Sequence, residues 1–587
     1  MPEISRPTYD FIVIGGGTAG NVVTGRLAEN PNVKILVVEA GEGNPKDVPE
    51  IMTPARAFEL RNSHYDWAYQ TFFVDKPDYE RVEKPNTRGK VLGGSSSLNY
   101  FTWLRGSKGT MDAWEEYGGP NWNWQGCKEY FNKPATYHDD HKMYDARFSE
   151  IGCDGPVHVS HAELLPETES FRQALTKAWT GEGLVVKEDI YDGEVHGLTH
   201  CISSVYGGVR SNSAAYLDGK DNIEFMFSSV ATKLNFEGMD NENAVVTSVT
   251  IFDQSQVSKT IWVRKEVIIS AGVFETPKLL LLSGIGPRRE LARHGLSPVI
   301  VSEHVGDHLL DHPILPHVFR LKDGTGLDHV LLQKGRHHDA ARAQYEKDKT
   351  GPLASGLLGM VAFPRIDERL SDHVQYRKAK EENGGKDPFG PEGQPYFEID
   401  FVPMFCDAFQ WHFPVPPEGD WLTVIVDLLR PQSKEGYVRL NTTDPREQPA
   451  INLNYFSNEL DILALREGVR YIDQILMEGD GMKDIIGEDY PWPMPRESDE
   501  EMDRLIMDRA QTGYHPCGTA RLSLDISQGV VDSELKVHGA KNLRIIDASI
   551  IPVIPDCGIQ NAVYMIAEKV RHTWCHKMNA NQDMVGC

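Results

Sequence analysis

One histidine stands in a turn from which it could act as a base. His515 lies in residues 513–521 (GYHPCGTAR), where Pro516 disfavours helix at the residue before it and the glycines permit tight turns. An imidazole with a pKa near neutrality can take the proton of a hydroxyl group. Taken alone, a turn histidine is more often structural, so this assignment depends on the rest of the sequence.

A glycine-rich turn near the start of the chain has the pattern of a phosphate-binding loop. Residues 15–20 (GGGTAG) match G-x-G-x-x-G between a strand-like run at 9–14 and a helical pattern at 21–29. Glycines there let backbone N–H groups approach a pyrophosphate at a helix N-terminus. Glu39 ends the next strand-like run, where a carboxylate accepts hydrogen bonds from an adenosine ribose. The pair predicts dinucleotide binding.

A second glycine-serine tract at residues 88–99 (RGKVLGGSSSLN) supplies another loop rich in hydrogen-bond donors. Its apolar Val91, Leu92 and Leu98 indicate a packed loop and disfavour one that is open to solvent. The tract is too far along the chain to belong to the first turn, so a long cofactor could use both. The glycine motif itself does not decide between FAD and NAD.

Other histidine clusters indicate little. Residues 138–141 (HDDH) and 337–339 (HHD) are neighbours on polar segments, and neighbours of this kind rarely converge on one ion. We therefore expect no metal site. His308 and His312, close to Asp311, are interpreted as part of a structural turn.

The strands that must position these motifs are far apart in the sequence. Apolar runs at 9–14, 33–39, 266–270 and 542–547 have the continuous apolar character of buried parallel strands. One sheet built from such distant segments requires a discontinuous nucleotide-binding domain that is interrupted by a second domain.

The interrupting segment contains alternating runs at 396–401 and 421–427, which predict an antiparallel sheet that could form the floor of a pocket. Residues 366–395, which directly precede the run at 396–401, are polar and rich in Lys, Glu, Gly and Pro. This composition predicts a surface insertion or a mobile loop.

Composition excludes several classes of protein. The net charge of -26 over 587 residues disfavours nucleic-acid binding. No run of about 18 apolar residues predicts a membrane span, and the polar first residues leave no room for a signal peptide. Eight cysteines without a C-x-x-C pair fit reduced thiols. We expect an intracellular, cytoplasmic protein that acts on a small molecule; the sequence does not indicate its oligomeric state.

Together the motifs resemble the glucose-methanol-choline (GMC) oxidoreductases, a family of FAD enzymes. The resemblance runs along essentially the whole chain, and its most similar members are the fungal formate oxidases. Its motifs are GGGTAG with Glu39, RGKVLGGSSSLN, residues 271–287 (AGVFETPKLLLLSGIGP), 305–313 (VGDHLLDHP), 515–522 (HPCGTARL) and 547–549 (DAS); segments 99–103, 409–414 and 554–557 carry the likeness to formate oxidases.

The resemblance implies an α/β fold with an antiparallel sheet, in which a discontinuous Rossmann-like FAD-binding domain joins an α+β substrate-binding domain. We expect the first domain over 1–165, 215–310 and 530–587, and the second over 166–214 and 311–529. The residues it implies for FAD binding are Gly15, Gly17, Thr18, Ala19, Gly20, Glu39, Ala40, Leu92, Gly93, Gly94, Ser97, Asn99, Val230, Asp547 and Ala548.

The chemistry implied by the family is hydride transfer from an alcohol or aldehyde hydrate to flavin N5, with His515 as the base and O2 or another acceptor reoxidising the flavin. Phe101, Trp411 and Gly558 would line the substrate pocket. Formate oxidases carry an 8-formyl flavin, so a modified FAD is to be looked for here.

One position departs from the pattern. Formate oxidases place an arginine 43 residues after the histidine of the motif, and this chain has Gly558 there. A guanidinium is well suited to holding a small carboxylate, so its absence weakens the prediction of formate oxidation. Open alternatives are an alcohol or aldehyde oxidase, a formate oxidase with an altered pocket, a natural-product tailoring flavoenzyme, and a lyase or flavin-binding protein of the same fold.

Overall fold

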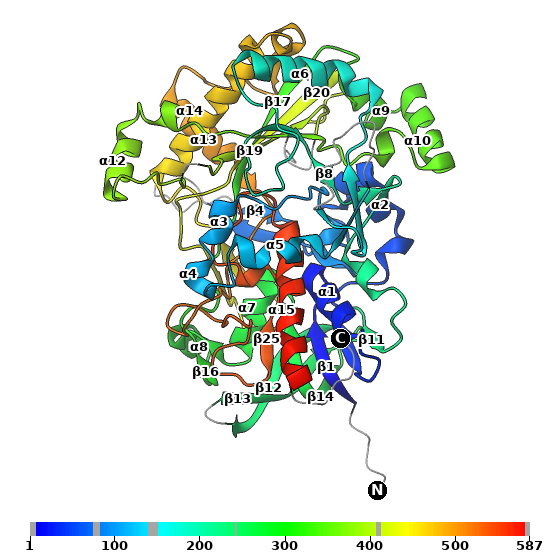
Figure 1. Ribbon diagram of the computed structural model, residues 1–587, viewed down its shortest axis with the longest axis vertical. Coiled ribbons are helices and arrows are strands. Elements are labelled where there is room, and N and C mark those ends of the chain that lie inside the picture. Colours follow the sequence, from blue (N-terminus) through cyan, green and yellow to red (C-terminus); the bar gives the residue numbers. More distant parts are fainter. Residues whose placement is uncertain are drawn as a thin grey trace.

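Two large sheets stand at opposite ends of the computed structural model (Figure 1). The structure describes residues 7–73, 83–138, 151–240, 243–391, 393–406 and 413–580. The sheet drawn at the bottom of Figure 1 contains β1 and β14, and the sheet drawn at the top contains β17 and β20. The cavity described below is lined by residues from both sheets.

The lower sheet is built from segments that are distant in the sequence. β1 (Thr8–Ile14) pairs in parallel with β2 (Ile35–Val38) on one side and with β14 (Ser258–Ile269) on the other. The last residues of β14 also pair in parallel with β25 (Leu543–Ile545). The apolar runs predicted to share one sheet therefore do so.

Three more strands complete this sheet. β11 (Ile223–Met226) adds to the edge at β2, while β12 (Val230–Asp240) and β13 (Asn243–Phe252) extend it beyond β14 as an antiparallel meander. The order is β11-β2-β1-β14-β13-β12, with β25 paired to β14. The sheet is thus parallel at its centre and antiparallel at one side.

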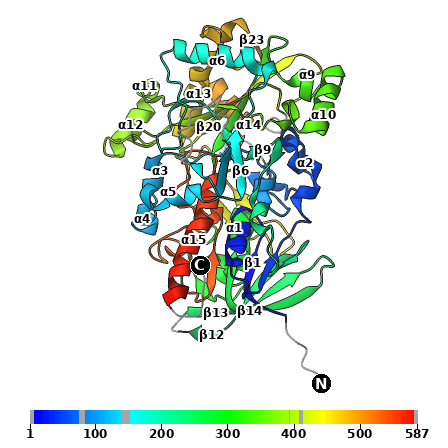
Figure 2. The ribbon, with the colours of Figure 1, turned by 45° about the vertical axis from the view of Figure 1, so that its right-hand side comes forward.

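Two helices from opposite ends of the chain pack together against this sheet. α1 (Thr18–Leu27) and α15 (Gln560–Ala580), blue and red in Figures 1 and 2, lie side by side. Arg26 of α1 forms an ion pair with Glu568 of α15 at 2.8 Å, and the Tyr216 hydroxyl donates to the same carboxylate at 2.6 Å. The C-terminal helix therefore secures the glycine-rich turn that precedes α1.

The upper sheet is antiparallel, as the alternating runs predict. Its order is β23 (Ile486–Tyr490), β17 (Pro313–Leu321), β20 (Asp420–Leu428), β19 (Phe397–Val402), β18 (Met360–Phe363) and β7 (Gly197–His200), and β24 (Gln511–Thr512) pairs with β17. Helices α13 (Glu459–Asp473) and α14 (Asp499–Arg509) lie near it. Every residue of β20 is buried, which explains its nearly continuous apolar sequence.

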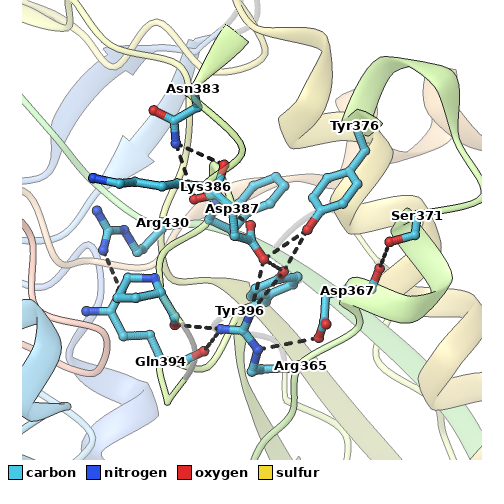
Figure 3. Close-up of polar contacts among 12 residues, drawn as sticks. Arg365, Asp367, Ser371, Tyr376, Asn383, Lys386, Asp387, Gln394, Tyr396 and Arg430 are labelled. Carbon is cyan, nitrogen blue, oxygen red and sulfur yellow. Dashed lines mark hydrogen bonds and ion pairs between the residues drawn. The ribbon is translucent and has the colours of Figure 1, made fainter. Parts of the chain in front are cut away.

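The polar segment before β19 is more ordered than a mobile loop. It forms α11 (Asp367–Leu370) and α12 (Val374–Glu382), and its return to the sheet is held by Asp387 (Figure 3). The Asp387 carboxylate accepts hydrogen bonds from Arg365 at 3.0 Å, from the Tyr376 hydroxyl at 2.9 Å, and from the Tyr396 hydroxyl. A carboxylate with these donors fixes the start of β19, because Tyr396 directly precedes that strand.

The fold is thus α/β with a second, antiparallel sheet, as expected. Within the residues that the structure describes, no helix has the length and apolar character needed to cross a membrane. The residue boundaries proposed for the two domains stay a prediction.

Candidate active site

A large cavity joins the glycine-rich turn to the turn that carries His515. About 1960 Å³ of atom-free space lies along it, part of which is open to solvent. Among the residues predicted from the sequence, those lining it are Gly15, Gly17, Thr18, Ala19, Glu39, Ala40, Gly94, Asn99, Val230, His515, Asp547, Ala548 and Gly558.

Close packing requires two glycines of the first turn, whereas a third glycine borders the cavity. Gly15 has φ +100°, and a Cβ on it would lie 2.3 Å from the Ser270 carbonyl oxygen. A Cβ on Gly20 would lie 2.0 Å from the Gly15 carbonyl oxygen, so α1 can approach β1 only with glycine there. A Cβ on Gly17, by contrast, would project into the cavity, with its nearest neighbour 3.8 Å away.

Glu39 is held where the turn and the end of β2 meet. Its carboxylate accepts the backbone N–H groups of Gly16 at 2.8 Å and Gly41 at 2.7 Å. Burial nevertheless raises the pKa of Glu39 to about 7, despite these two hydrogen bonds. A ribose with two hydroxyl donors would complete the environment of this carboxylate.

The second glycine-serine tract packs directly on the first turn. The Gly93 N–H donates to the Gly16 carbonyl at 2.7 Å, and a Cβ on Gly94 would lie 2.7 Å from Gly17 Cα. The Ser97 hydroxyl donates to the Leu92 carbonyl at 2.9 Å. Gly20, Leu92, Gly93 and Ser97 are not among the residues lining the cavity, and they position its walls instead.

Asp547 joins two segments that meet near the glycine-rich turn. Its carboxylate accepts from the Gly272 N–H at 2.9 Å, the Thr276 hydroxyl at 2.7 Å and the Ser549 N–H at 2.8 Å. The glycine cradle, the buried Glu39 carboxylate and the continuous cavity fit FAD, with its adenosine half at Glu39 and its flavin end towards His515.

His515 is placed by contacts on one side of its ring and is open on the other. Its Nδ1 lies 3.1 Å from Nδ1 of His312, and its backbone N–H donates to Asp311 at 2.9 Å. Its Nε2 faces the cavity, 3.5 Å from the position of a Cβ on Gly558. Burial and the charge of Arg88 lower the pKa of His515 to about 3, so the ring is neutral.

The contact with His312 restricts the tautomers that the two rings can adopt together. Burial and the neighbouring His515 hold the pKa of His312 well below its usual range, so neither ring is charged. Two neutral imidazoles can share the 3.1 Å contact only if one Nδ1 carries a proton. When His515 is the donor, its Nε2 presents a lone pair to the cavity.

Asp427 completes this group, which the sequence does not bring together. Its Oδ2 lies 3.7 Å from Nδ1 of both His312 and His515. The three side chains offer atoms within 4.8 Å of one another and could therefore surround a cation, although the sequence indicates no metal site. His312, interpreted from the sequence as part of a turn, is instead a direct neighbour of the candidate base.

Gly558 lies beside His515, as the motif spacing predicts. A Cβ there would lie 3.3 Å from the Thr102 hydroxyl and 3.5 Å from His515 Nε2. The neighbouring Gln560 donates to the Thr102 carbonyl at 3.1 Å and is thereby held to the backbone. Position 558 thus faces the candidate base without a side chain.

Phe101, which is expected at the substrate pocket, is not placed there. Phe101 is buried but does not line the cavity, and the Arg210 guanidinium lies 3.9 Å above its ring. Its φ of +74° reverses the local backbone, so that Tyr100 and Thr102 line the cavity in its place. Trp411 lies outside the described residues.

Two acidic residues of β19, Glu398 and Asp400, also line the cavity. Their sequence signal is the alternation in FEIDFV, which puts both acids on the same face of a strand. The sequence predicts that this run is part of a pocket floor, but it assigns no role to the two acids. Only the pairing with β20 shows which face of the strand is turned to the cavity.

Comparison with known proteins agrees with this geometry. Two family models, both described as GMC oxidoreductase, match residues 9–314 and 431–567. Pyranose dehydrogenase 3 from Leucoagaricus meleagris is 33% identical over 585 residues, covering 95% of this chain and 92% of the relative. An oxygen-dependent choline dehydrogenase from Escherichia coli (strain K12) is 29% identical over 570 residues, covering 96% of this chain and 94% of the relative.

Among solved structures, one of formate oxidase from Aspergillus oryzae RIB40 has a TM-score of 0.95 and 54% sequence identity. The match covers 98% of this chain and 99% of that one. That structure concerns the effect of an arginine-to-alanine mutation on FAD modification in the enzyme. The chain described here belongs to the GMC oxidoreductase family of FAD-binding flavoproteins.

Proposed function

We propose that the protein oxidises an alcohol, or the hydrate of an aldehyde, with His515 as the base. The observation that carries this proposal is the environment of the imidazole. Its Nδ1 is occupied by His312, while its Nε2 opens into the cavity. The ring is neutral because burial lowers its pKa to about 3, so it can accept a proton.

The roles of the protein groups follow from this arrangement. His515 Nε2 takes the hydroxyl proton as the C–H bond breaks, and a bound FAD supplies the acceptor for the hydride. Nδ1 of the imidazolium formed in this step lies 3.7 Å from Asp427 Oδ2, an oxygen that would favour the charged ring once this carboxyl group is ionised. Thr102 and Gly558 limit the space next to Nε2 and orient the substrate hydroxyl. O2 or another acceptor then takes the electrons.

Formate oxidation is the second candidate, supported by the 54% identity to formate oxidase. The carboxyl groups of Glu398, Asp400 and Asp427 line the cavity, and Arg88 is the one lysine or arginine among its described lining residues. Arg88 donates to the Tyr514 carbonyl at 2.7 Å. A small carboxylate would find no uncommitted guanidinium among the described lining residues, which favours the alcohol or aldehyde.

Larger substrates of tailoring enzymes would also use the space beside Gly558, and the lyase alternative requires no hydride transfer. Anaerobic mixing with alcohols, aldehydes and formate separates these functions. Bleaching of the flavin absorbance near 450 nm by an alcohol or aldehyde is expected. An unchanged spectrum with every compound would overturn the proposal, and bleaching by formate alone would favour the second candidate. The spectrum of the released flavin tests whether it is 8-formyl-FAD.

A further inference from the structure

Three carboxyl groups share one face of the upper sheet, next to the candidate base. Glu398 and Asp400 are two residues apart in β19 and therefore project from the same face. Asp427 of β20 is the direct cross-strand partner of Glu398. All three line the cavity, and we call them the carboxylate face.

The carboxylate face lacks the partners that buried acids require. Glu398 and Asp427 are each 3% exposed, and Glu398 Oε2, Asp400 Oδ1 and Asp427 Oδ1 accept no hydrogen bond from the residues described. Acids directly opposite each other on adjacent strands repel when ionised. Burial and neighbouring carboxyl groups raise the pKa of both residues well above the usual range; the neighbours are Asp400 for Glu398, and Glu398 with Asp400 for Asp427. A buried acid cluster of this kind is costly unless a cation or a set of donors completes it.

No side chain of the described cavity wall supplies that cation. The described residues place no lysine or arginine in an ion pair with Glu398, Asp400 or Asp427. Formate oxidases have an arginine at the position of Gly558, but here only the backbone of Gly558 hydrogen-bonds Glu398. Position 558 therefore supplies no positive charge that could neutralise the carboxylate face.

The carboxylate face is rigid enough to act as a binding surface. The residue before β19, Tyr396, is held by Asp387, and Gln394 accepts from Arg430 at 2.5 Å while donating to the Thr110 hydroxyl at 3.0 Å (Figure 3). β19 pairs with β20 from Phe397 to Val402 and with β18 from Ile399 to Phe401. Glu398 and Asp400 thus project from a strand that is fixed along its length.

We propose that the carboxylate face binds the protonated amine of an amino-alcohol substrate, whose hydroxyl group is oxidised at His515. The unpartnered oxygens are acceptors, so they select an ammonium group that has N–H donors over a quaternary ammonium, which has none. Gly558 lies between Glu398 and His515, so a short chain links the amine to the reacting carbon. The carbon that bears the hydroxyl would lose a hydride to a bound flavin, the hydroxyl oxygen would lose its proton to His515, and the product is an amino aldehyde. The oxidation step of this inference rests on the proposed function, whereas the ammonium-binding site does not.

Binding is tested on the FAD-loaded protein with compounds that carry no C–H bond on an oxygen-bearing carbon and so cannot be oxidised as alcohols. Calorimetry with tert-butylammonium, tetramethylammonium, tert-butanol and pivalate compares four groups of similar size. We expect tert-butylammonium to bind at least about 10-fold more tightly than the other three, as charge-assisted hydrogen bonds are worth about 1.5–3 kcal/mol. Equal affinities, or tighter binding of tetramethylammonium, would overturn the inference.

Isosteric variants then locate the site. Glu398→Gln and Asp400→Asn should each weaken tert-butylammonium binding by about 10-fold and leave the FAD content unchanged. Glu500→Gln is the matched control, because the Glu500 side chain is 85% exposed on α14. Wild-type affinity in both cavity variants would contradict the assignment. If either variant fails to retain FAD, the affinity of Gly558→Arg for tert-butylammonium is measured instead. It should be lower than that of the wild type, because the guanidinium should compete with the ligand.

Turnover separates this inference from the proposed function. We expect 3-aminopropanol to reduce the flavin with a kcat/KM about 100-fold higher than that of 1-butanol, and Glu398→Gln to reduce this ratio about 10-fold. Oxidation of butanol without ammonium binding would refute the cation site and leave the oxidase function intact. Ammonium binding without reduction by any alcohol would leave the site intact and refute the oxidation.

Discussion

The Nδ1 atoms of His312 and His515 lie 3.1 Å apart, although 203 positions separate the two residues. The contact is brought about by the start of β17, where the His312 carbonyl accepts the Gly513 N–H at 2.7 Å and the Tyr455 hydroxyl at 3.0 Å. These bonds fix His312 to the turn that carries His515. The candidate base therefore has one free nitrogen and one committed nitrogen, and this asymmetry underlies the first predictions.

Replacing the base should slow the reaction without removing the cofactor. We expect His515→Ala to lower the rate of anaerobic flavin reduction by about 100-fold or more, since general-base catalysis contributes about 10²–10⁴-fold. Stopped-flow absorbance measures the rate, and the ratio of flavin to protein absorbance measures FAD content. His337→Ala, on the exposed α10 (Arg336–Asp348), is the matched control. Near-normal reduction in His515→Ala would remove this residue from the mechanism.

The partner imidazole should act through position and tautomer. His312→Leu removes the group that occupies Nδ1 of His515, so both tautomers become available and only some molecules present a lone pair at Nε2. We expect kcat to fall about 10-fold, the pH profile to shift and KM to change little. His312→Asn retains an acceptor and should restore part of the rate. Equal losses in both variants, with an unchanged pH profile, would indicate a purely structural role.

The pH dependence of flavin reduction should lack the ordinary histidine ionisation. Burial and Arg88 lower the pKa of His515 from 6.5 to about 3, so the ring stays neutral at pH values well above 3. The rate should therefore not decline through His515 near pH 6.5. Since the folded pKa is depressed, this group's contribution to stability is fully present above about pH 6.5 and is lost as the pH falls towards 3. A decline in rate centred near pH 6.5 that disappears in His515→Ala would contradict this prediction.

The glycines of the first turn should respond differently to alanine. In Gly15→Ala the new methyl group would meet the Ser270 carbonyl oxygen at 2.3 Å in a left-handed backbone, so we expect a loss of several kcal/mol and poor folding. In Gly17→Ala the methyl group has 3.8 Å of free space but enters the cavity. That variant should fold normally and bind FAD more weakly. Thermal unfolding and flavin absorbance distinguish the two, and identical behaviour would contradict the assigned roles.

Restoring arginine at position 558 tests what determines substrate choice. A Cβ fits there at 3.3 Å from Thr102 and 3.5 Å from His515, and a guanidinium could then pair with the carboxylate face. We expect Gly558→Arg to gain measurable formate turnover, with Gly558→Ala as the matched control that adds bulk without charge. Formate turnover that appears in both variants, or in neither, would place the determinant of specificity elsewhere in the pocket.

The sequence predicted the parts of the site that are encoded locally. The turn at 15–20 and the tract at 88–99 contain their own glycines, and the motif spacing placed Gly558 beside His515 correctly. His312 was missed because its role arises only when β17 meets the turn at 513–515. Phe101 was assigned to the pocket, but a positive φ turns its ring towards Arg210, and no residue pattern signals that reversal.

In the two large sheets, too, only the features that are encoded locally could be predicted. Runs of apolar residues identified the strands, because burial on both faces leaves a local trace in composition. The only sequence signal of the carboxylate face is the alternation of acids in β19. The alignment of Glu398 with Asp427 is not visible, since it depends on the register between two strands. Strand register is decided by packing over the whole sheet, and it is not visible in either segment alone.

The place of β25 in the lower sheet has a consequence for synthesis of the protein. Ile269 of β14 pairs with Ile14 of β1 and also with Ile545 of β25, so the sheet lacks a strand until residues 543–545 have left the ribosome. Until then the exposed side of β14 is an open edge in a long nascent chain, the situation in which strands pair wrongly between molecules. The yield of correctly folded protein should therefore depend on how quickly the residues between β14 and β25 are synthesised, and on chaperones that cover that edge while they are made.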